Sequence, residues 1–286
     1  MSEVIPLSNI NEWKQKIDGL CWRINRLSPG QQITLDMNKI TFMRPQGAIM
    51  LLLICNRIWE LTGKEIKLNN IASPVLAYME RVNFFEFPFA YTDKKLSFWD
   101  KFNRSVDSPT VMEITHVESP LDSGNIETRV RGIIENWFPE RKETKFCSGV
   151  ATMVAEICNN SLEHSRGYNV MGECYCMLQK YSMHGKPEIA IAVGDIGVGI
   201  RHHLKFKYTW MLDSDVLSIK KAISGLSGRE DGSGGMGIPF IKQTISSYNG
   251  LFAIRSGKGL VEVHGNVNSS EFQNSFPGTQ TLLVLD

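Results

Sequence analysis

The sequence predicts an α/β protein of two domains. We expect a small α/β domain over residues 1–100, followed by an α/β sandwich over 108–286 with helices on one face of a mixed sheet. The chain of 286 residues exceeds the usual size of a single domain. Strand and helix patterns alternate from the N-terminus, as in small α/β units. An irregular aromatic stretch then separates them from a second group of helices and strands.

Helix and strand patterns follow each other closely in residues 1–100. Apolar residues recur every three or four positions where we expect helices, and alternate with polar residues where we expect strands. Gly63 is suited to ending a helix, and the pair Ser73-Pro74 to starting one. The expected elements are a helix over 8–28, a strand over 32–37, a helix over 47–62, a strand over 65–70 and a helix with Ser73 as its N-cap.

Residues 84–122 are irregular and rich in aromatic side chains. We place the domain boundary near 90–108, where prolines and charged residues interrupt the pattern. The aromatic residues are too many for a flexible linker, so we expect them to pack the two domains together. A groove for a protein partner is the alternative.

The second domain begins with a predicted strand over 110–118. Alternating and helical patterns then follow to the end of the sequence. The further expected elements are helices over 126–138 and 147–165, strands over 169–181 and 187–195, a connecting lid over 201–234, a helix over 236–248, and strands over 251–256, 260–264 and 279–285.

The charge balance argues against a nucleic acid or an acidic membrane as the main partner. The chain has 31 basic and 30 acidic residues, with no strong excess of either sign. The most apolar run, residues 47–61, contains Asn56, Arg57 and Glu60 and is too short to cross a bilayer. No signal-peptide pattern is present at the start. We therefore expect a soluble, cytoplasmic protein.

The cysteine pattern also fits a reducing compartment. The chain has six cysteines, and none has the C-x-x-C spacing of a zinc knuckle or a redox pair. Several lie in apolar helical or alternating patterns. We expect buried free thiols.

Two polar residues stand beside an apolar helical stripe in "VATMVAEICNNSLEHS" (150–165). Glu156 and Asn160 are four residues apart, so both project from the same face of the helix. Magnesium takes oxygen ligands and is often shared with phosphates, and a neutral carboxamide supplies such an oxygen. A carboxylate one turn away could accept a proton from a water or hydroxyl. The alternative is a helix end with two solvated polar groups.

Two glycine turns accompany this helix. In "AIAVGDIGVGI" a buried strand ends at Asp195, and Gly197 and Gly199 force a tight turn that would let a flat base approach. In "DGSGGMGIPFIKQ" the residues Gly234, Gly235 and Gly237 precede a helix, whose free N–H groups attract anions. This segment lacks the lysine of a P-loop and the spacing of a dinucleotide-binding strand–turn–helix. Together the motifs predict a nucleotide pocket.

The order Glu-x-x-x-Asn, Asp-x-Gly-x-Gly, Gly-x-Gly before a helix, then Gly-Thr before a strand resembles the GHKL ATPase superfamily. The resemblance covers about residues 123–286 and is nearest to the kinase branch, which includes anti-sigma-factor serine kinases and histidine-kinase catalytic domains. Three features depart from that pattern: Ser161 replaces the common alanine, Ser233 stands where the kinase branch often has its first lid glycine, and about twenty residues separate Ser256 from Gly278.

The resemblance implies a role for each motif residue, with ATP and Mg²⁺ as ligands. It implies Glu156 as the general base and Asn160 as the Mg²⁺ ligand. It implies Asp195 as the partner of the adenine amino group. The remaining nucleotide-binding residues that it implies are Gly197 and Gly199 at the base, Gly234, Gly235 and Gly237 at the phosphates, and Thr279 near the adenine.

The first domain resembles the STAS domain, the fold of anti-sigma-factor antagonists. The resemblance covers roughly residues 30–88 and rests on "ITLDMNKITFMRPQGAIMLLL", "GKEIKLNNI" and "VLAYMERVNFFEF". Where that family carries a phosphorylatable serine, this chain has Gln46, which cannot accept a phosphoryl group. We therefore expect a scaffold or docking domain.

Three functions follow as hypotheses. The first is an ATP-driven switch with slow hydrolysis, whose lid or STAS-like domain contacts a protein partner. The second is a serine or histidine protein kinase of the anti-sigma-factor type that acts on a separate protein. The third is a non-catalytic nucleotide sensor, which the presence of Glu156 disfavours. The sequence leaves open whether the chain forms a homodimer and what the insertion 257–277 does.

Overall fold

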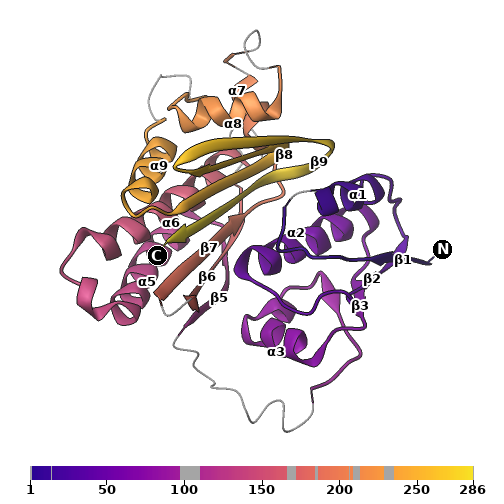
Figure 1. The fold of residues 1–286 in the computed structure, drawn as a ribbon. Helices are drawn as coiled ribbons and strands as arrows, with labels where there is room; N and C mark the ends of the chain where they lie inside the picture. The colour runs from indigo at the N-terminus through magenta and orange to yellow at the C-terminus, as the bar shows by residue number, and fades with distance from the viewer. Residues whose placement is uncertain are drawn as a thin grey trace.

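The computed structural model describes residues 2–13, 15–96, 110–165, 172–183, 186–205, 207–208, 213–228 and 235–285. The protein has an α/β fold with two sheets (Figure 1). The first is parallel, in the order β1-β2-β3-β4, and the second has the order β5-β6-β7-β9-β8. The predicted domain boundary falls largely on residues 97–109, which lie outside the described residues.

The first sheet is built from residues 2–91. Its elements are β1 (Ser2–Pro6), α1 (Gln15–Ile24), β2 (Gln32–Asp36), α2 (Pro45–Thr62), β3 (Ile66–Asn69), α3 (Ser73–Arg81), a 3₁₀ turn at Phe84–Glu86, and β4 (Ala90–Tyr91). The prediction of a helix end at Gly63 is confirmed: this residue has φ = 66° and its N–H donates to the carbonyl of Trp59.

Two N-terminal predictions are wrong in detail. The helix expected over 8–28 is shorter, and a strand that was not predicted, β1, precedes it. Ile10 and Trp13 lie in an irregular segment before the helix, but both are buried and their spacing resembles that of a helix. Ser73 is the first residue of α3 and not its N-cap. Ala72 holds the cap position in extended conformation, and Pro74 still lies in the first turn.

The second sheet is built from residues 111–285. Its elements are β5 (Val111–Val117), α5 (Pro120–Trp137), a 3₁₀ turn at Pro139–Arg141, α6 (Lys145–His164), β6 (Cys174–Met183), β7 (Lys186–Gly194), α7 (Gly199–Lys205), α8 (Asp215–Ile223), α9 (Gly237–Ser247), β8 (Leu251–His264) and β9 (Asn266–Leu285).

This sheet is antiparallel and not mixed as expected. All four strand pairings in it are antiparallel. Strands β6 and β7 form one hairpin and β8 and β9 another; β5 pairs with β6, and β9 joins the two hairpins by pairing with β7. The strands expected over 251–256 and 260–264 form one strand, and the strand expected over 279–285 begins at Asn266. Residues 257–277 therefore extend the β8–β9 hairpin.

The two faces of the second sheet are covered by different parts of the chain. Helices α5, α6 and α9 pack on one face (Figure 1). Helix α2 packs on the other face, where its apolar residues share a core with Met177, Ala192 and Leu282. Residues 45–56 of α2 are all buried. This helix therefore lies between the two sheets, in one core to which both sheets contribute.

The contact between the two halves of the chain extends well beyond α2. The hairpin extension meets α1, where the N–H of Asn274 donates to Oδ1 of Asp18 at 2.7 Å. Phe87 and Phe89 place their edges against the ring of Tyr175, with centroids 5.2 and 6.4 Å apart. For these two rings, the prediction that the aromatic stretch packs the domains together is confirmed. Phe98, Trp99 and Phe102 lie outside the described residues.

Two further predictions bear on the cysteines and on membrane insertion. All six cysteines are buried as free thiols, as expected. Within the part of the chain that the structure describes, every helix is too short or too polar to span a bilayer.

Candidate functional site

A pocket lies among α6, α7, α8 and α9, above the ends of β7, β8 and β9. The pocket is partly open to solvent, and its walls combine apolar side chains with a few polar ones, as in small-molecule sites. The motif residues Asn160, Asp195, Gly199, Gly235, Gly237 and Thr279 all line it. The structure therefore brings motifs from four separate segments to one pocket.

Asp195 is fixed at the floor of this pocket. It follows β7, and only 4% of its surface is exposed. Its Oδ1 accepts hydrogen bonds from the N–H groups of Gly197 (2.8 Å) and Thr279 (3.2 Å). Its Oδ2 accepts from the hydroxyl of Ser161 at 3.0 Å. Burial raises the pKa of Asp195 to about 6, although these three hydrogen bonds act in the opposite direction.

Glycine is required around Asp195 because the backbone segments approach so closely. A Cβ on Gly197 would lie 1.9 Å from the carbonyl oxygen of Ser165. A Cβ on Gly278 would lie 2.1 Å from the carbonyl oxygen of Asp195, and Gly278 has φ = 77°. Gly199 has φ = 79°, in the left-handed region that favours glycine. These turns hold the Asp195 carboxylate against β9.

Glu156 and Asn160 lie one turn apart on α6, both partly exposed. Gly237, the first residue of α9, lies directly against them. A Cβ at Gly237 would be 2.6 Å from Oε2 of Glu156 and 3.6 Å from Nδ2 of Asn160. The glycine therefore allows the N-terminus of α9 to reach the carboxylate and the carboxamide.

The glycine segment before α9 is described only from residue 235 onward. Gly235 lines the pocket with φ = 80°, and a Cβ there would lie 2.3 Å from the carbonyl oxygen of Gly225. Met236, at the N-cap position of α9, makes no side-chain cap. The first N–H groups of a helix without such a cap are suited to bind an anion. Gly234 lies outside the described residues.

The predicted lid over 201–234 contains two helices where it is described. The remainder of α7 and the whole of α8 fall in it, and Leu204 and Ala222 from the two helices pack together beside the pocket. The rings of His164 on α6 and His203 on α7 stack at 3.9 Å between centroids. Oδ2 of Asp215 accepts from the N–H of Lys258, which ties α8 to the hairpin extension.

Sequence reasoning missed three polar residues that support the site. Ser161 was recognised only as a departure from the family pattern, yet its hydroxyl holds Asp195. The hydroxyl of Ser256 lies 3.2 Å from that of Thr279 and accepts from the N–H of Ile200 at 3.0 Å. Gln280 is fully buried next to Asp195. A polar residue inside the apolar run "TQTLLVL" was the signal that could have identified Gln280.

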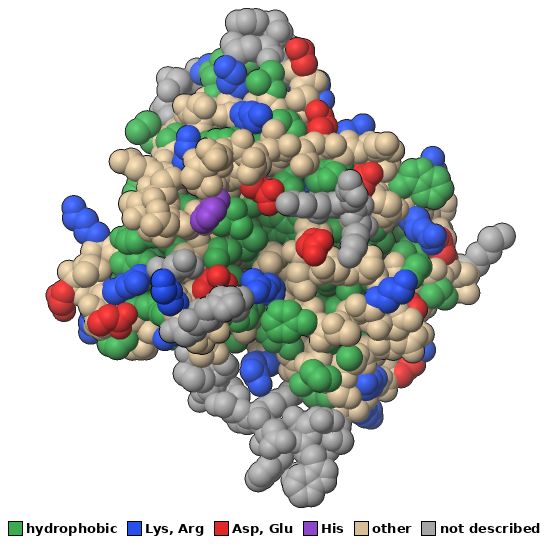
Figure 2. Space-filling model, in the orientation of Figure 1, with side chains coloured by type: hydrophobic (Ala, Val, Ile, Leu, Met, Phe, Trp, Pro, Cys, Tyr) green, Lys and Arg blue, Asp and Glu red, His purple; other side chains and the backbone are tan. Residues whose placement is uncertain are grey.

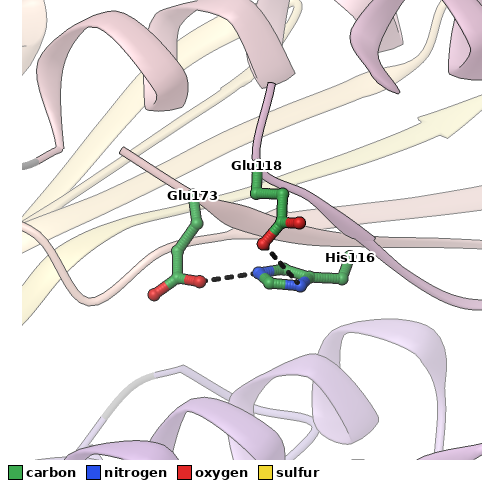
Figure 3. Close-up of side chains that lie close together, drawn as sticks. All are labelled: His116, Glu118 and Glu173. Carbon is green, nitrogen blue, oxygen red and sulfur yellow. Dashed lines mark hydrogen bonds and ion pairs between the residues drawn. The ribbon is translucent and has the colours of Figure 1, made fainter. Parts of the chain in front are cut away.

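A second group of titratable residues lies away from the pocket, at β5 and the start of β6 (Figure 3). His116 has Nε2 at 2.6 Å from Oε2 of Glu173 and Nδ1 at 3.7 Å from Oε2 of Glu118. Its ring stacks on Tyr175 at 4.8 Å. Three such side chains can hold a cation, and in this structure each imidazole nitrogen faces a carboxylate oxygen.

The surface charges agree with the balanced composition. Figure 2 shows basic and acidic side chains interspersed over the face that it presents, without a large area of one sign. Comparison with known proteins gives no match, either to a protein-family model or to a curated protein. The residues and their geometry are therefore the basis for assigning the site.

Proposed function

We propose that this chain binds ATP with Mg²⁺ in the pocket beside α6 and hydrolyses it slowly, as a switch that acts on a protein partner. The observation that supports this most strongly is the buried carboxylate of Asp195. It is fixed by three hydrogen bonds in a pocket that Asn160 and the first residue of α9 also line, and Glu156 lies beside that residue.

Asp195 would recognise the adenine. Its Oδ2 has one protein donor among the described residues, the hydroxyl of Ser161, so it can accept a second hydrogen bond from an exocyclic amino group. Apolar residues of the pocket, including Ile157, Ile241 and Ile254, would lie against the flat faces of the base. The close glycine turn at Gly197 and Gly199 leaves this space open.

The other end of the pocket fits a phosphate chain and a magnesium ion. Gly235 and Gly237 would let phosphate oxygens reach the N–H groups of α9. The side-chain oxygen of Asn160 would be the protein ligand of Mg²⁺, and when bound this ion would neutralise phosphate charge. The donor set, one neutral oxygen with space for water and phosphate, suits this ion.

Glu156 would act as the general base. It lies on the same helix face as Asn160 and beside the first residue of α9, where the terminal phosphate would end. From there its carboxylate can orient a water molecule and accept its proton. A kinase reaction would use the same residues with a hydroxyl of another protein in place of water.

The chain's own STAS-like segment, residues 44–47, would not be the substrate of a kinase reaction, because Gln46 cannot accept a phosphoryl group. Arg44 lies 3.8 Å from Glu188 of β7, and the residues after it form the first turn of α2, on the sheet face opposite α6. The sheet therefore separates this segment from the pocket. A kinase of this kind would act on a separate protein.

Isothermal titration calorimetry with ATP, in the presence and absence of Mg²⁺, tests the proposal. Wild-type protein should bind ATP, and Mg²⁺ should strengthen binding. Asn160→Ala should abolish the Mg²⁺ effect, whereas Ser148→Ala, at an exposed hydroxyl on the same helix, should not. Equal Mg²⁺ dependence in wild type and Asn160→Ala would remove the proposed ligand. With γ-³²P-ATP, free phosphate supports a switch ATPase and a labelled second protein supports a kinase.

A further inference from the structure

We propose that helix α2 of the N-terminal domain positions the adenine-recognising carboxylate of Asp195, and that Gly194 and Gln280 are the residues through which it does so. This inference rests on the proposed function, because it assigns to the N-terminal domain a role at that same pocket.

Gly194 is the point at which α2 touches the strand that carries Asp195. It is the last residue of β7 and immediately precedes the aspartate. A Cβ at Gly194 would lie 2.7 Å from Cδ1 of Leu53 and 3.1 Å from Cγ2 of Ile49, both on α2. The helix therefore rests on the backbone of the strand itself. Gly194 has no positive φ, so close packing and not backbone conformation favours glycine here.

Gln280 lies beside Gly194 on the neighbouring strand, with its side chain on the face that α2 covers, and holds the backbone of Asp195. It is the β9 partner of Gly194 in the sheet, and its Cγ would lie 3.5 Å from the same added Cβ. Its Nε2 donates to the carbonyl oxygens of Asp195 (3.1 Å) and Pro277 (3.0 Å). This links the aspartate to the turn that precedes Thr279, whose N–H donates to Oδ1 of Asp195.

Burying the side chain of Gln280 costs free energy, and its link to Asp195 is the feature that offsets this cost. Gln280 is 0% exposed, and its Oε1 has no hydrogen-bond partner within the described residues. An amide oxygen buried in this way is unfavourable, whereas an apolar residue of similar shape would carry no such penalty. The two bonds from Nε2 are the favourable counterpart.

These contacts make the position of α2 and the position of the carboxylate interdependent. Leu53 and Ile49 contact the strand end at Gly194, and Gln280, next to the same position, fixes the carbonyl of Asp195. A displacement of α2 would therefore move Oδ2 relative to the base. By linkage, a partner that shifts α2 would change nucleotide affinity, and the nucleotide would change partner affinity by the same factor.

A rescue experiment separates positioning from general loss of stability. Gly194→Ala adds a methyl group against Leu53, and we expect ATP affinity to fall at least tenfold by calorimetry. Gly194→Ala combined with Leu53→Ala removes the obstruction, and we expect most of the affinity to return, although Leu53→Ala itself lowers the urea midpoint. If the two changes only added their destabilising effects, the double variant would bind no better than Gly194→Ala.

Two further variants complete the test. Gly132→Ala is the matched control, because a Cβ there would meet nothing within 4 Å, and its ATP affinity should equal that of wild type. Gln280→Met keeps the shape but removes both hydrogen bonds, and should lower ATP affinity at least fivefold without lowering the urea midpoint to the same degree as Leu53→Ala.

The outcomes distinguish this inference from the proposed function. Two outcomes would overturn the positioning role alone, in each case with wild-type protein that binds ATP. In the first, Gly194→Ala binds ATP as tightly as wild type; in the second, the double variant binds as weakly as Gly194→Ala. A wild-type protein that binds no adenine nucleotide overturns both. Loss in the single variant with recovery in the double variant supports the inference.

Discussion

The replacement Asp195→Asn should stabilise the ligand-free protein at neutral pH while removing the adenine recognition that we propose for this residue. Burial raises the pKa of Asp195 from the ordinary 3.8 to about 6 in the folded protein. Between these values the folded state binds more protons than the unfolded state, so stability falls as pH rises from about 4 to about 6. The difference of about 2 pKa units corresponds to about 3 kcal/mol at neutral pH.

The structure indicates that the asparagine can keep the same hydrogen bonds without the buried charge. Its Oδ1 can accept from the N–H groups of Gly197 and Thr279, as the aspartate does. Its Nδ2 can donate to the hydroxyl oxygen of Ser161, which reverses that bond without breaking it. The substitution removes the negative charge, and it replaces the acceptor Oδ2, which would face the base, by the donor Nδ2.

Urea unfolding of wild type and Asp195→Asn without nucleotide, followed by tryptophan fluorescence at several pH values from 4 to 8, measures this effect. The two proteins should have nearly equal stability near pH 4. The variant should become more stable by up to about 3 kcal/mol above pH 7, while its ATP and ADP affinities fall together. A stability difference that does not change with pH, or a variant that is less stable at pH 8, would refute the reasoning.

Two other variants test the phosphate end of the pocket and the interface behind it. Glu156→Ala should bind ATP yet release phosphate at least tenfold more slowly, a loss of about 1.4 kcal/mol or more of transition-state stabilisation, in a phosphate-release assay; equal rates would favour the nucleotide sensor. Arg255→Met should stabilise the protein by about 1–3 kcal/mol and so raise the urea midpoint, because the fully buried Arg255 has Nε and Nη1 without hydrogen-bond acceptors among the described residues. The contacts that the guanidinium does make, with Cys21 Sγ and with the rings of Phe272 and Phe276 at 5.0 and 5.9 Å, are expected to compensate for its burial only in part. A lower midpoint would show that this guanidinium is favourable where it lies.

Local patterns predicted the elements that are determined by local physics. The apolar helix ending at Gly63 and the strand ending at Asp195 were correctly located, because a left-handed glycine and a polar residue after a buried strand are signals within a few residues. The segments that carry Asn160, Asp195, Gly237 and Thr279 were identified as parts of one pocket only through their order, and all four residues line one pocket in the structure. Glu156 is not among the lining residues, but its carboxylate lies beside Gly237.

The arrangement of the sheets could not be predicted in the same way. The apolar residues around α2 indicate a buried helix, but not the second surface that covers it, since that surface comes from strands more than a hundred residues later. The antiparallel order depends on hairpins such as the one at Gly265, which has φ = 66° and extends β8 and β9 beyond the expected strands. Gln280 acquires its role only from this pairing, because β9 places it beside Gly194.

The most direct measurement of the central claim compares ATP with ITP. The two nucleotides differ at the position where adenine carries its amino group and hypoxanthine a carbonyl. At pH 7.5, above the pKa of about 6 of Asp195, its carboxylate should accept a hydrogen bond from ATP and face an acceptor in ITP. Since a hydrogen bond to a charged group contributes about 1.5–3 kcal/mol, wild-type protein should bind ITP at least tenfold more weakly in the presence of Mg²⁺. Equal affinity for the two would contradict the assignment of Asp195 and of the pocket as an adenine nucleotide site.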